Sequence, residues 1–558
     1  MRRPPAGTRL VTAEQMAAID RAAIQGRGIP ALRLMERAGK EAAHAIAEWW
    51  KSSGLSRRPQ PAGPIVRGRR PAALPGLGAS SPAGPVLILC GRGNNGGDGL
   101  EAARQLKAAG FVVRALVAGD EESLSADSQA SYEACVKGRV PVTLLPDQRA
   151  WGPGSEAADA VERAAFLVDA LLGTGSKGAP RGAAAAAIDL ALASGKPIAS
   201  IDLPSGVDAS TGHVESPAIR ADFTVTLALA KVGLAIEPGR EHAGAVEVVD
   251  IGIPPDLVEA TQPSVLVAGP AWARSLLPHR PAHAHKGSVG RVLVVGGSSG
   301  MMGAVALASG SALRVGAGYS VAAVPRSCVD ALESRISEVV KRGYAETDDR
   351  SLARAALDAI LLEAMRADVV AIGPGLSRHP ETEELARDLL ERVEAPVVLD
   401  ADGLNAFEGK SLRRTHGPLI VTPHYGEAAR LVGKPVGEVA RDPVGWARSF
   451  AETSGAIVCL KSVPMVTAAR GEPAILNSTG NPGMATAGAG DVLTGTVAGL
   501  LAQGMDPVEA AAVGCFVHGL AGDIAARRVG RRGMIAGDIR DALPAALVAL
   551  ESGALDES

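Results

Sequence analysis

Hydrophobic residues in the first half of the chain fall into short continuous runs, which longer stretches with helical spacing separate. Apolar residues from Glu14 to Trp50 recur at helical spacing and predict helices at the start. Continuously apolar strands that alternate with helices are typical of a mostly parallel sheet covered on both faces. We therefore predict strands within residues 85–90, 111–119, 140–146, 164–173, 196–206, 222–230 and 245–252.

The same alternation starts again in the second half, after prolines interrupt it between residues 254 and 281. Two series of this kind fit the length of 558 residues without a third domain. We predict two tandem three-layer α/β/α domains, a Rossmann-like domain at residues 1–258 and a second α/β domain at residues 262–558. The second series of apolar runs lies at residues 291–297, 319–325, 367–375, 395–403, 418–424 and 456–461.

One segment of the first domain has a different character. Residues 51–85 are dense in Pro, Gly, Ser and Arg and have no hydrophobic periodicity. This composition favours a mobile surface insertion over a packed element of secondary structure. We therefore leave this segment out of the predicted sheet and helices.

Composition excludes several classes of protein. Aromatic residues make up only 3% of the chain and the net charge is −3, so we expect no nucleic-acid partner. No run approaches the ~18 apolar residues of a membrane helix, and no signal peptide opens the chain, so we expect no membrane. Five scattered cysteines without a C-x-x-C pair argue against a disulfide framework or a zinc ribbon. We expect a cytoplasmic protein.

The first glycine-rich loop, CGRGNNGGDG at residues 90–99, follows a predicted strand and precedes a helix. It contains a formal G-x-G-x-x-G, which is a weak signal for a dinucleotide-binding loop. Asp98 argues against that interpretation, because it falls where a pyrophosphate would lie and the two anions would repel each other. The side-chain oxygen of Asn95 suits a hard cation better than a phosphate.

Two other loops follow predicted strands in the same way. The segment 168–180 carries Asp169 and then glycines, and the segment 200–208 carries Asp202 and Ser205. In open parallel sheets ligands bind outside the carboxyl ends of the strands, so three oxygen-rich loops there predict one site. The alternative is that each aspartate only caps a helix or shapes a turn.

The motifs NNGGDG, DALLGTG and DLPSG, in this order, resemble the NAD(P)H-hydrate epimerase domain, the YjeF N-terminal family. The resemblance covers roughly residues 10–255, and it implies that Asp202 is the acid/base for inversion at C6 of the hydrated nicotinamide ring. It implies a potassium ion bound by Asn95, Asp169 and Ser205. It also implies a substrate pocket lined by Asn94, Asn95, Gly96, Gly97, Asp98, Gly173, Thr174, Gly175, Ser176, Lys177, Gly178, Ala179 and Asp202.

Two motifs early in the second domain allow other interpretations. GGSSG at residues 296–300 matches G-x-S-x-G, so Ser298 could be a hydrolase nucleophile with Asp400 and His424 as its partners. Such matches are frequent in glycine-rich chains, and we do not favour this one. The cluster of His279, His283 and His285 could bind a metal, but no Cys or carboxylate beside it completes a site, which favours a solvated linker.

The strongest local signal is GNPGMATAGAGDVLTG at residues 480–495, where glycines lead up to Asp491 and a helix. Backbone N–H groups of residues 487–490 can bind a phosphate at the positive end of that helix. An ionised Asp491 there can accept a proton from an attacking hydroxyl, as phosphoryl transfer requires. The alternative is a plain glycine-rich helix start.

GAGD at the start of a helix resembles the ribokinase-like superfamily. With HKG, GGSSGMMGA, IGPGL, LDADGLNAF and TPHYGE, it resembles the ADP/ATP-dependent NAD(P)H-hydrate dehydratase across roughly residues 265–550. The resemblance implies ADP or ATP with Mg²⁺, and substrate contacts at Ala304, Gly375, His424 and Asp491. It also implies nucleotide contacts at Lys461, Ser462, Val463, Pro464, Met465 and Gly490. Ser462 and Met465 stand where the family usually has Gly and Thr.

Together these resemblances imply a bifunctional NAD(P)H-hydrate repair enzyme with a Rossmann-like and a ribokinase-like domain. The expected small molecules are the hydrates NADHX and NADPHX with ADP or ATP, and a homo-oligomer is possible. The alternative is a ribokinase-like kinase for a small hydroxylated substrate, with a first domain that only binds. A kinase of that kind has no evident need for HKG or TPHYGE.

Overall fold

The computed structural model describes residues 8–53, 66–67, 84–414 and 416–555. The chain divides into two compact units, Arg9–Ser264 and Val265–Ser558, and each is described here by itself. Most of the predicted mobile insertion at 51–85 lies outside the described residues. The helices of the first unit are α1 (Ala13–Arg21), α2 (Ala31–Ser53), α3 (Asn94–Ala108), α4 (Ala126–Lys137), α5 (Glu156–Arg163), α6 (Gly182–Ala193), α7 (Gly239–Ala243) and α8 (Pro255–Ala260).

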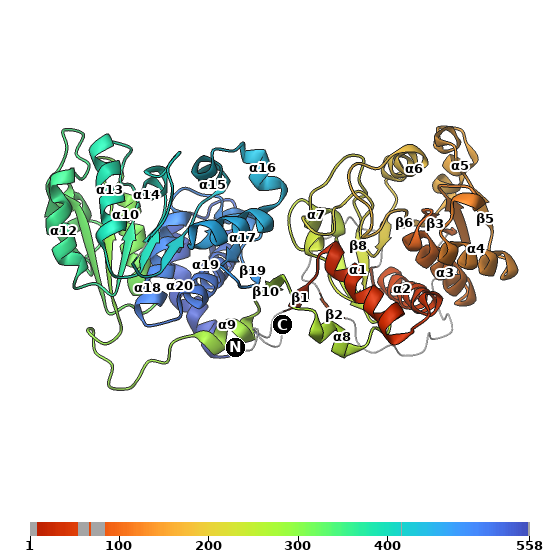
Figure 1. Ribbon diagram of the computed structural model, residues 1–558, viewed down its shortest axis with the longest axis horizontal. Coiled ribbons are helices and arrows are strands. Elements are labelled where there is room, and N and C mark those ends of the chain that lie inside the picture. The colour runs from red at the N-terminus through yellow and green to blue at the C-terminus, as the bar shows by residue number, and fades with distance from the viewer. Residues whose placement is uncertain (1–7, 54–65, 68–83, 415, 556–558) are drawn as a thin grey trace. The chain divides into compact units, whose positions relative to one another are not determined.

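The sheet of the first unit contains every strand that the hydrophobic pattern predicts there. Its order is β2-β9-β8-β7-β6-β3-β4-β5 and all its pairs are parallel. Helices cover both of its faces (Figure 1), where side chains form two separate hydrophobic clusters. The strands are β2 (Val66–Arg67), β3 (Val86–Cys90), β4 (Val113–Val117), β5 (Val142–Leu144), β6 (Phe166–Ala170), β7 (Ile198–Ile201), β8 (Phe223–Leu227) and β9 (Ala245–Val249).

The strand order of this sheet reverses at β3, which has β4 on one side and β6 on the other. The chain therefore leaves β3 and β6 in opposite directions, and a crevice opens between their carboxyl ends, as at other switch points of α/β sheets. The loops that begin at Gly91 and Leu171 cross here at close range. A Cβ on Gly91 would lie 1.8 Å from the backbone oxygen of Leu171.

The second unit extends its sheet beyond what the sequence predicted. The predicted strands are present and parallel, but four further strands were not predicted: β10, β13, and β18 with β19, which continue the sheet from β17 in antiparallel pairs. The strands β10, β18 and β19 have three residues each, too short for a hydrophobic period to show, and the sequence of β13, VKRGY, is mainly polar. The order runs β10-β19-β18-β17-β16-β15-β14-β11-β12-β13, with β10 (Val265–Val267), β11 (Arg291–Val295), β12 (Tyr319–Pro325), β13 (Val340–Tyr344), β14 (Val369–Ile372), β15 (Val397–Leu399), β16 (Leu419–Val421), β17 (Ile457–Leu460), β18 (Val466–Ala468) and β19 (Ala474–Leu476).

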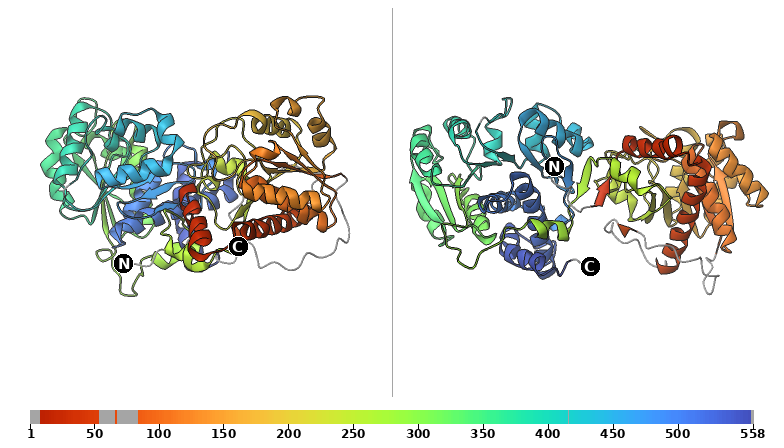
Figure 2. Two further views of the ribbon diagram at one scale, coloured as in Figure 1. Left: turned by 45° about the vertical axis from the view of Figure 1, so that its right-hand side comes forward. Right: turned by 60° about the horizontal axis from the view of Figure 1, so that its bottom comes forward.

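The switch point of this second sheet lies at β11, between β14 and β12. Helices lie on both sides of the sheet (Figure 2), and α10, α18, α19 and α20 share its largest hydrophobic cluster. The helices of the unit are α9 (Pro270–Leu276), α10 (Met302–Arg314), α11 (Val329–Glu333), α12 (Leu357–Ala364), α13 (Pro380–Arg392), α14 (Asp402–Asn405), α15 (Tyr425–Val432), α16 (Val436–Arg441), α17 (Pro443–Ser454), α18 (Ala489–Ala502), α19 (Pro507–Val529) and α20 (Ala536–Glu551).

Helix α19 differs from the sequence expectation that no segment could cross a membrane. In the described part of the chain it is the helix that is long and apolar enough to do so by length and composition. However, 78% of its apolar window is buried inside the structure. Burial of this kind is what the central helix of a packed core requires, and α19 contributes to the same cluster as α10 and α18.

The close crossing at Gly91 gives a prediction about stability. Replacement Gly91→Ala would force a methyl group against backbone atoms that cannot rotate away. We expect a loss of about 1–3 kcal/mol, as in other overpacked cores, and a lower melting temperature of the full chain in calorimetry. Gly93→Ala is the matched control, because nothing lies within 4 Å of its added Cβ. Equal melting temperatures for the two variants would contradict the crossing.

Candidate active sites

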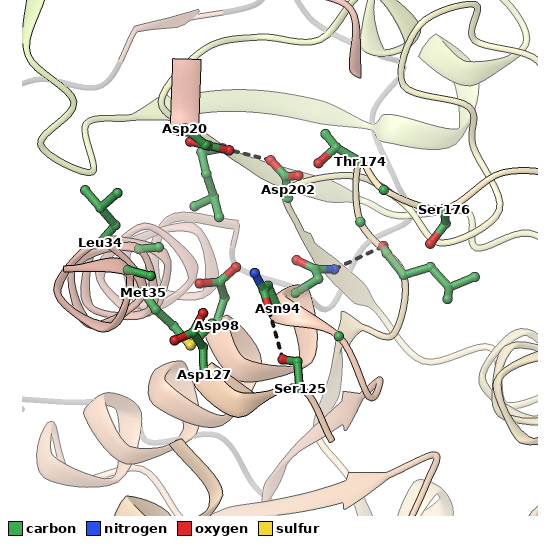
Figure 3. Close-up of a pocket in the computed structure, with 18 of the residues that line it drawn as sticks. Asp20, Leu34, Met35, Asn94, Asp98, Ser125, Asp127, Thr174, Ser176 and Asp202 are labelled. Carbon is green, nitrogen blue, oxygen red and sulfur yellow. Dashed lines mark hydrogen bonds between the residues drawn. The ribbon is translucent and has the colours of Figure 1, made fainter. Parts of the chain in front are cut away.

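A cavity of about 740 Å³ opens at the switch point of the first sheet. Its walls come from the loops after β3 and β6, from the end of β7, and from α1 and α2 on the opposite side (Figure 3). The sequence-predicted residues that line it are Asn94, Asn95, Asp98, Gly173, Thr174, Gly175, Ser176 and Asp202. Lining residues that the motifs did not indicate include Met16, Asp20, Leu34, Met35, Asp127 and Lys231.

The remaining residues predicted for this pocket lie elsewhere in the structure. Gly96 and Gly97 are buried in the first turn of α3, where an added Cβ would lie 1.9 Å from Gly91 O and 2.6 Å from Met35 Sδ. They allow close packing beneath the cavity. Lys177 is exposed, and Gly178 lines a separate cavity of about 40 Å³. Ala179 is half-buried and lines neither cavity.

Asp202 lies directly after β7 in a left-handed backbone conformation, with φ of +69°. Such a conformation costs a non-glycine residue about 1–3 kcal/mol and clusters at functional sites. Its Oδ1 accepts hydrogen bonds from Leu227 N at 3.2 Å and from the ammonium of Lys231. Lys231 is only 1% exposed and also donates to Thr226 Oγ1 and Leu227 O. A buried ion pair therefore stands at one wall of the cavity.

Sequence reasoning missed both Lys231 and Asp20. Lys231 follows an apolar strand in LALAKVG, and a lysine in such a run is the signal that could have indicated it. Burial raises the pKa of Asp20 to about 6, with Lys231 lowering it and Asp202 raising it. Burial, and then the charges of Asp202 and Asp20, raise the pKa of Asp98 well above its usual range. The cavity thus holds carboxyl groups that favour different protonation states.

The predicted potassium ligands are joined by hydrogen bonds through the backbone of Leu172. Asn95 Nδ2 donates to Leu172 O at 3.0 Å, and Leu172 N donates to Ser205 Oγ at 2.9 Å. Ser205 Oγ donates to Asp169 Oδ1 at 2.6 Å. Asn95 Oδ1 is buried and has no hydrogen-bond partner among the described residues. One orphaned amide oxygen, a hydroxyl and one carboxylate make a donor set that fits a large monovalent cation better than a divalent one.

Asp169 itself is fully buried, and both of its carboxylate oxygens accept hydrogen bonds. Its oxygens accept from Ser205 Oγ, Ser205 N, Ser200 Oγ and Leu171 N at 2.6–3.2 Å. Burial raises the pKa of this carboxyl, while these hydrogen bonds lower it. Asp169 therefore fixes the loops after β6 and β7 relative to each other, in addition to any contact with an ion.

A second group of buried charges lies at the carboxyl ends of the strands in the second unit. Lys461, just after β17, donates from Nζ to Asp400 Oδ1 at 2.7 Å, and Thr494 Oγ1 donates to Asp400 Oδ2 at 2.6 Å. A Cβ on Gly490 would lie 3.0 Å from Lys461 Nζ. The lysine predicted to contact a nucleotide thus pairs with Asp400 directly beside the glycine-rich helix start.

Asp491 occupies the third position of α18, and Gly488, with φ of +91°, is the N-cap. Burial, then the charges of Asp400, Asp402 and Glu427, raise the pKa of Asp491 to about 7, although Lys461 lowers it. Desolvation and like charges therefore oppose the stabilising effect of the helix dipole on this carboxylate. A pKa near 7 still suits a proton acceptor at neutral pH.

The predicted substrate contacts of this unit come from the segments that follow β11, β14 and β16. An added Cβ on Gly375 would lie 3.3 Å from Ala304 Cβ, so these residues are neighbours. His424 caps α15, and its Nδ1 accepts from Gly426 N at 2.9 Å and Glu427 N at 3.3 Å. Burial, and then Lys461 and Arg430, lower the pKa of His424. His424 is therefore a neutral group at the site.

The hydrolase alternative does not fit these contacts. Ser298 is buried and its Oγ donates to Gly375 O at 2.9 Å. Asp400 is occupied by Lys461 and Thr494, so Ser298, His424 and Asp400 form no hydrogen-bonded triad. The histidine alternative fits no better: in the described residues, His279, His283 and His285 belong to no group able to hold a metal ion.

The segment predicted to hold the nucleotide is divided between core and surface. Ser462 is buried and its Oγ donates to Pro464 O at 2.6 Å, while Val463 is 60% exposed. Met465 packs against the hydrophobic core. Ser462 and Met465, which replace the usual Gly and Thr, are therefore accommodated within the fold.

Tandem α/β units that each bring a glycine-rich helix start to buried aspartates define a class of two-site nucleotide-processing enzymes. A family model described as NAD(P)H-hydrate dehydratase matches residues 292–545, and one described as YjeF-related protein N-terminus matches residues 31–233. The bifunctional NAD(P)H-hydrate repair enzyme Nnr of Moorella thermoacetica is 42% identical over 545 residues, 97% of each chain. The chain belongs to the family of bifunctional NAD(P)H-hydrate repair enzymes, which confirms the resemblance.

Two further similarities extend this comparison. The bifunctional NAD(P)H-hydrate repair enzyme Nnr of Thermofilum pendens is 40% identical over 467 residues, 83% of this chain and 88% of its own. The crystal structure of ADP/ATP-dependent NAD(P)H-hydrate dehydratase from Bacillus subtilis, co-crystallised with ATP/Mg²⁺, aligns with a TM-score of 0.45. That alignment is 28% identical and covers 51% of this chain and 98% of the other.

The environment of Asp491 gives a prediction about stability and pH. Its pKa of about 7 in the folded chain exceeds the usual 3.8, so folding becomes less favourable as pH rises through this interval. Asp491→Asn removes the ionisation. The free energy of unfolding of the variant should therefore exceed that of the parent by an amount that grows between pH 4 and 7. At pH 8 this difference should reach about 4 kcal/mol. Melting temperatures at pH 4 and pH 8 check this, and a gain that is equal at both values would contradict it.

Proposed function

We propose that the first domain, residues 1–258, equilibrates the R and S epimers of NADHX and NADPHX. The second domain, residues 262–558, removes water from the S epimer at the expense of ADP or ATP. The observation that carries this proposal is membership of the family along 97% of the chain, with a cluster of buried charges at the carboxyl end of each sheet. The free and buried cysteines of the described chain are consistent with a cytoplasmic location.

In the first domain, the loops after β3 and β6 bind the hydrated nicotinamide nucleotide. A cavity of about 740 Å³ has the size typical of small-molecule sites. Asp202 is the acid/base at C6, because it lines this cavity and is fixed by Lys231.

Potassium is the proposed cofactor of this domain. Asn95 Oδ1, Ser205 Oγ and Asp169 would hold it, and its charge would order the loops around the substrate. The orphaned oxygen of Asn95 supports this assignment, since a buried acceptor without a partner costs about 1–3 kcal/mol.

In the second domain, Asp491 accepts the proton of the ring hydroxyl as that hydroxyl attacks the terminal phosphate of ADP or ATP. The start of α18 holds the transferring group, and the phosphorylated hydroxyl then leaves as phosphate. Residues Lys461 to Met465 and Gly490 bind the nucleotide, while Ala304, Gly375 and His424 contact the substrate. Mg²⁺ would neutralise phosphate charge, and Asp402, a half-buried carboxylate whose charge acts on Asp491, would help to hold it.

Removal of the orphaned oxygen tests the potassium site. Asn95→Ala should slow epimerisation and weaken its dependence on potassium concentration, while the dehydration of the S epimer stays unchanged. Asp169→Ala should do the same, with an added loss of stability because it removes four buried hydrogen bonds. The measurement is the epimerisation rate in potassium and in tetramethylammonium salts. If the epimerisation rate of Asn95→Ala depends on potassium as strongly as that of the parent, Asn95 is not a potassium ligand.

Replacement of the proposed base tests the second reaction. Asp491→Asn keeps the shape of the side chain but cannot accept the proton, and general-base catalysis is worth about 10²–10⁴ in rate. We expect a loss in that range in nucleotide-dependent recovery of NADH absorbance, with nucleotide binding retained and epimerisation unaffected. Asp541→Asn, at an exposed position on α20, is the control. A folded Asp491→Asn variant with more than about a tenth of the parent rate would exclude Asp491 as the base.

A further inference from the structure

Charged groups from five different elements converge on the cavity of the first unit. Asp20 comes from α1, Asp98 from α3, Asp127 from α4, and Asp202 with Lys231 from the ends of β7 and β8. Figure 3 shows Asp98 and Asp202 on different sides of the same space. The other cation of the lining, Arg92, is exposed. The buried carboxyl groups therefore share a single buried ammonium.

The hydrogen bonds of Lys231 determine which carboxyl group receives its charge. Its three N–H donors go to Asp202 Oδ1, to Thr226 Oγ1 at 3.1 Å and to Leu227 O at 2.9 Å. An ammonium whose donors are all used is fixed in position. Asp202 Oδ2 accepts no hydrogen bond within the described part of the chain and belongs to the cavity lining. Lys231 is thus paired with one oxygen of Asp202, and the other oxygen of this cavity-lining residue has no hydrogen bond from the described residues.

Asp98 has the opposite environment. It is 9% exposed, it accepts no hydrogen bond from the described residues, and the groups around it are mainly acidic. Burial raises the pKa of Asp98 most, and the negative charges of Asp202, Asp20 and Asp127 raise it further. The positive charge of Lys231 lowers it. Asp98 is therefore the carboxyl group without a compensating partner, whereas Asp202 is paired with Lys231.

We propose that Asp98 and Asp202 form a pair of opposed acid and base for epimerisation, and that Lys231 is the positioning residue that keeps Asp202 a carboxylate. This inference rests on the proposed epimerase function and specifies its chemistry. Inversion by loss and return of water needs a proton donor on one side of the ring and a proton acceptor on the other.

The steps balance in protons and electrons. Asp98 gives its proton to the hydroxyl on C6, the C6–O bond breaks, and the lone pair of N1 forms an N1=C6 double bond as water leaves. A second water attacks C6 from the opposite face, a new C6–O bond forms as the N1=C6 electrons return to N1, and Asp202 accepts the released proton. The pair then has the protonation that the reverse inversion needs.

The fate of the C6 oxygen tests the proposal with the parent enzyme. Epimerisation in ¹⁸O-labelled water should incorporate one solvent oxygen for each inversion, above the exchange measured without enzyme. A route that opens the ring by breaking C6–N1 retains the original oxygen as an aldehyde. Enzymatic inversion without label would therefore overturn the proposal, although the epimerase function itself would stand. Absence of any inversion by the parent would instead overturn the proposed function.

Variants of Lys231 and Asp98 test the individual roles. Lys231→Met removes the positive charge that pairs with Asp202, so the acid limb of the pH–rate profile should move to higher pH and the rate at pH 7 should fall at least tenfold. Lys231→Arg keeps the positive charge, so its rate at pH 7 should be much closer to the parent's than that of Lys231→Met. A difference of this kind would not be expected if Lys231 only supported the fold. Asp98→Asn should lose about 10²–10⁴ in rate.

Exposed residues of the same unit provide the matched controls. Lys137→Met and Asp189→Asn change the same residue types on α4 and α6, and both should retain the parent rate and pH profile. The melting temperature of each variant reports whether the first unit is folded, and dehydration of the S epimer reports that the second domain is active. A Lys231→Met variant with the parent's pH profile, or an Asp98→Asn variant with the parent's rate, would overturn the assignment.

Discussion

Burial of aspartates at the carboxyl ends of parallel strands is the constraint on which both sites depend. A carboxylate removed from water must gain an opposite charge, gain hydrogen bonds, or keep its proton. All three solutions occur here. Asp202 and Asp400 each pair with a lysine, Asp169 accepts four hydrogen bonds, and the pKa of Asp98 rises well above its usual range.

The two units solve this problem in the same way despite their different sheets. In the first, Lys231 extends from the end of β8 to Asp202 at the end of β7. In the second, Lys461 extends from the end of β17 to Asp400 at the end of β15. In each case the lysine neutralises one aspartate and leaves another carboxyl group, Asp98 or Asp491, with a raised pKa. Groups with such opposed environments are the ones suited to acid–base chemistry.

Much of the fold was predictable because continuous apolar runs have no other stable place than a covered parallel sheet. The loops after β3, β6 and β7 were predictable as a site for the same reason, since ligands bind at the carboxyl ends of strands. The strands β18 and β19 were not, because three residues carry no period. Gly96 and Gly97 were assigned to the pocket by motif, but packing against Gly91 and Met35 determines their position.

The residues that sequence reasoning missed act through partners that are distant in the chain. Lys231 matters because it contacts Asp202, and Asp20 because the fold brings α1 over the same cavity. Neither belongs to a glycine-rich motif. The raised pKa of Asp491 has a related origin, because the dipole of its own helix is local whereas Asp400, Asp402 and Glu427 approach from other elements. Motifs therefore located the sites, and tertiary contacts determined their electrostatics.

The central claim is that two sites in one chain act in sequence on one damaged nucleotide. The most direct test resolves the R and S epimers of NADHX chromatographically while NADH absorbance is followed, with and without ADP or ATP. Without nucleotide, the enzyme should bring either pure epimer to the same mixture and form no NADH. With nucleotide, both epimers should be converted completely to NADH. An R epimer that persists after the S epimer is consumed would contradict the account.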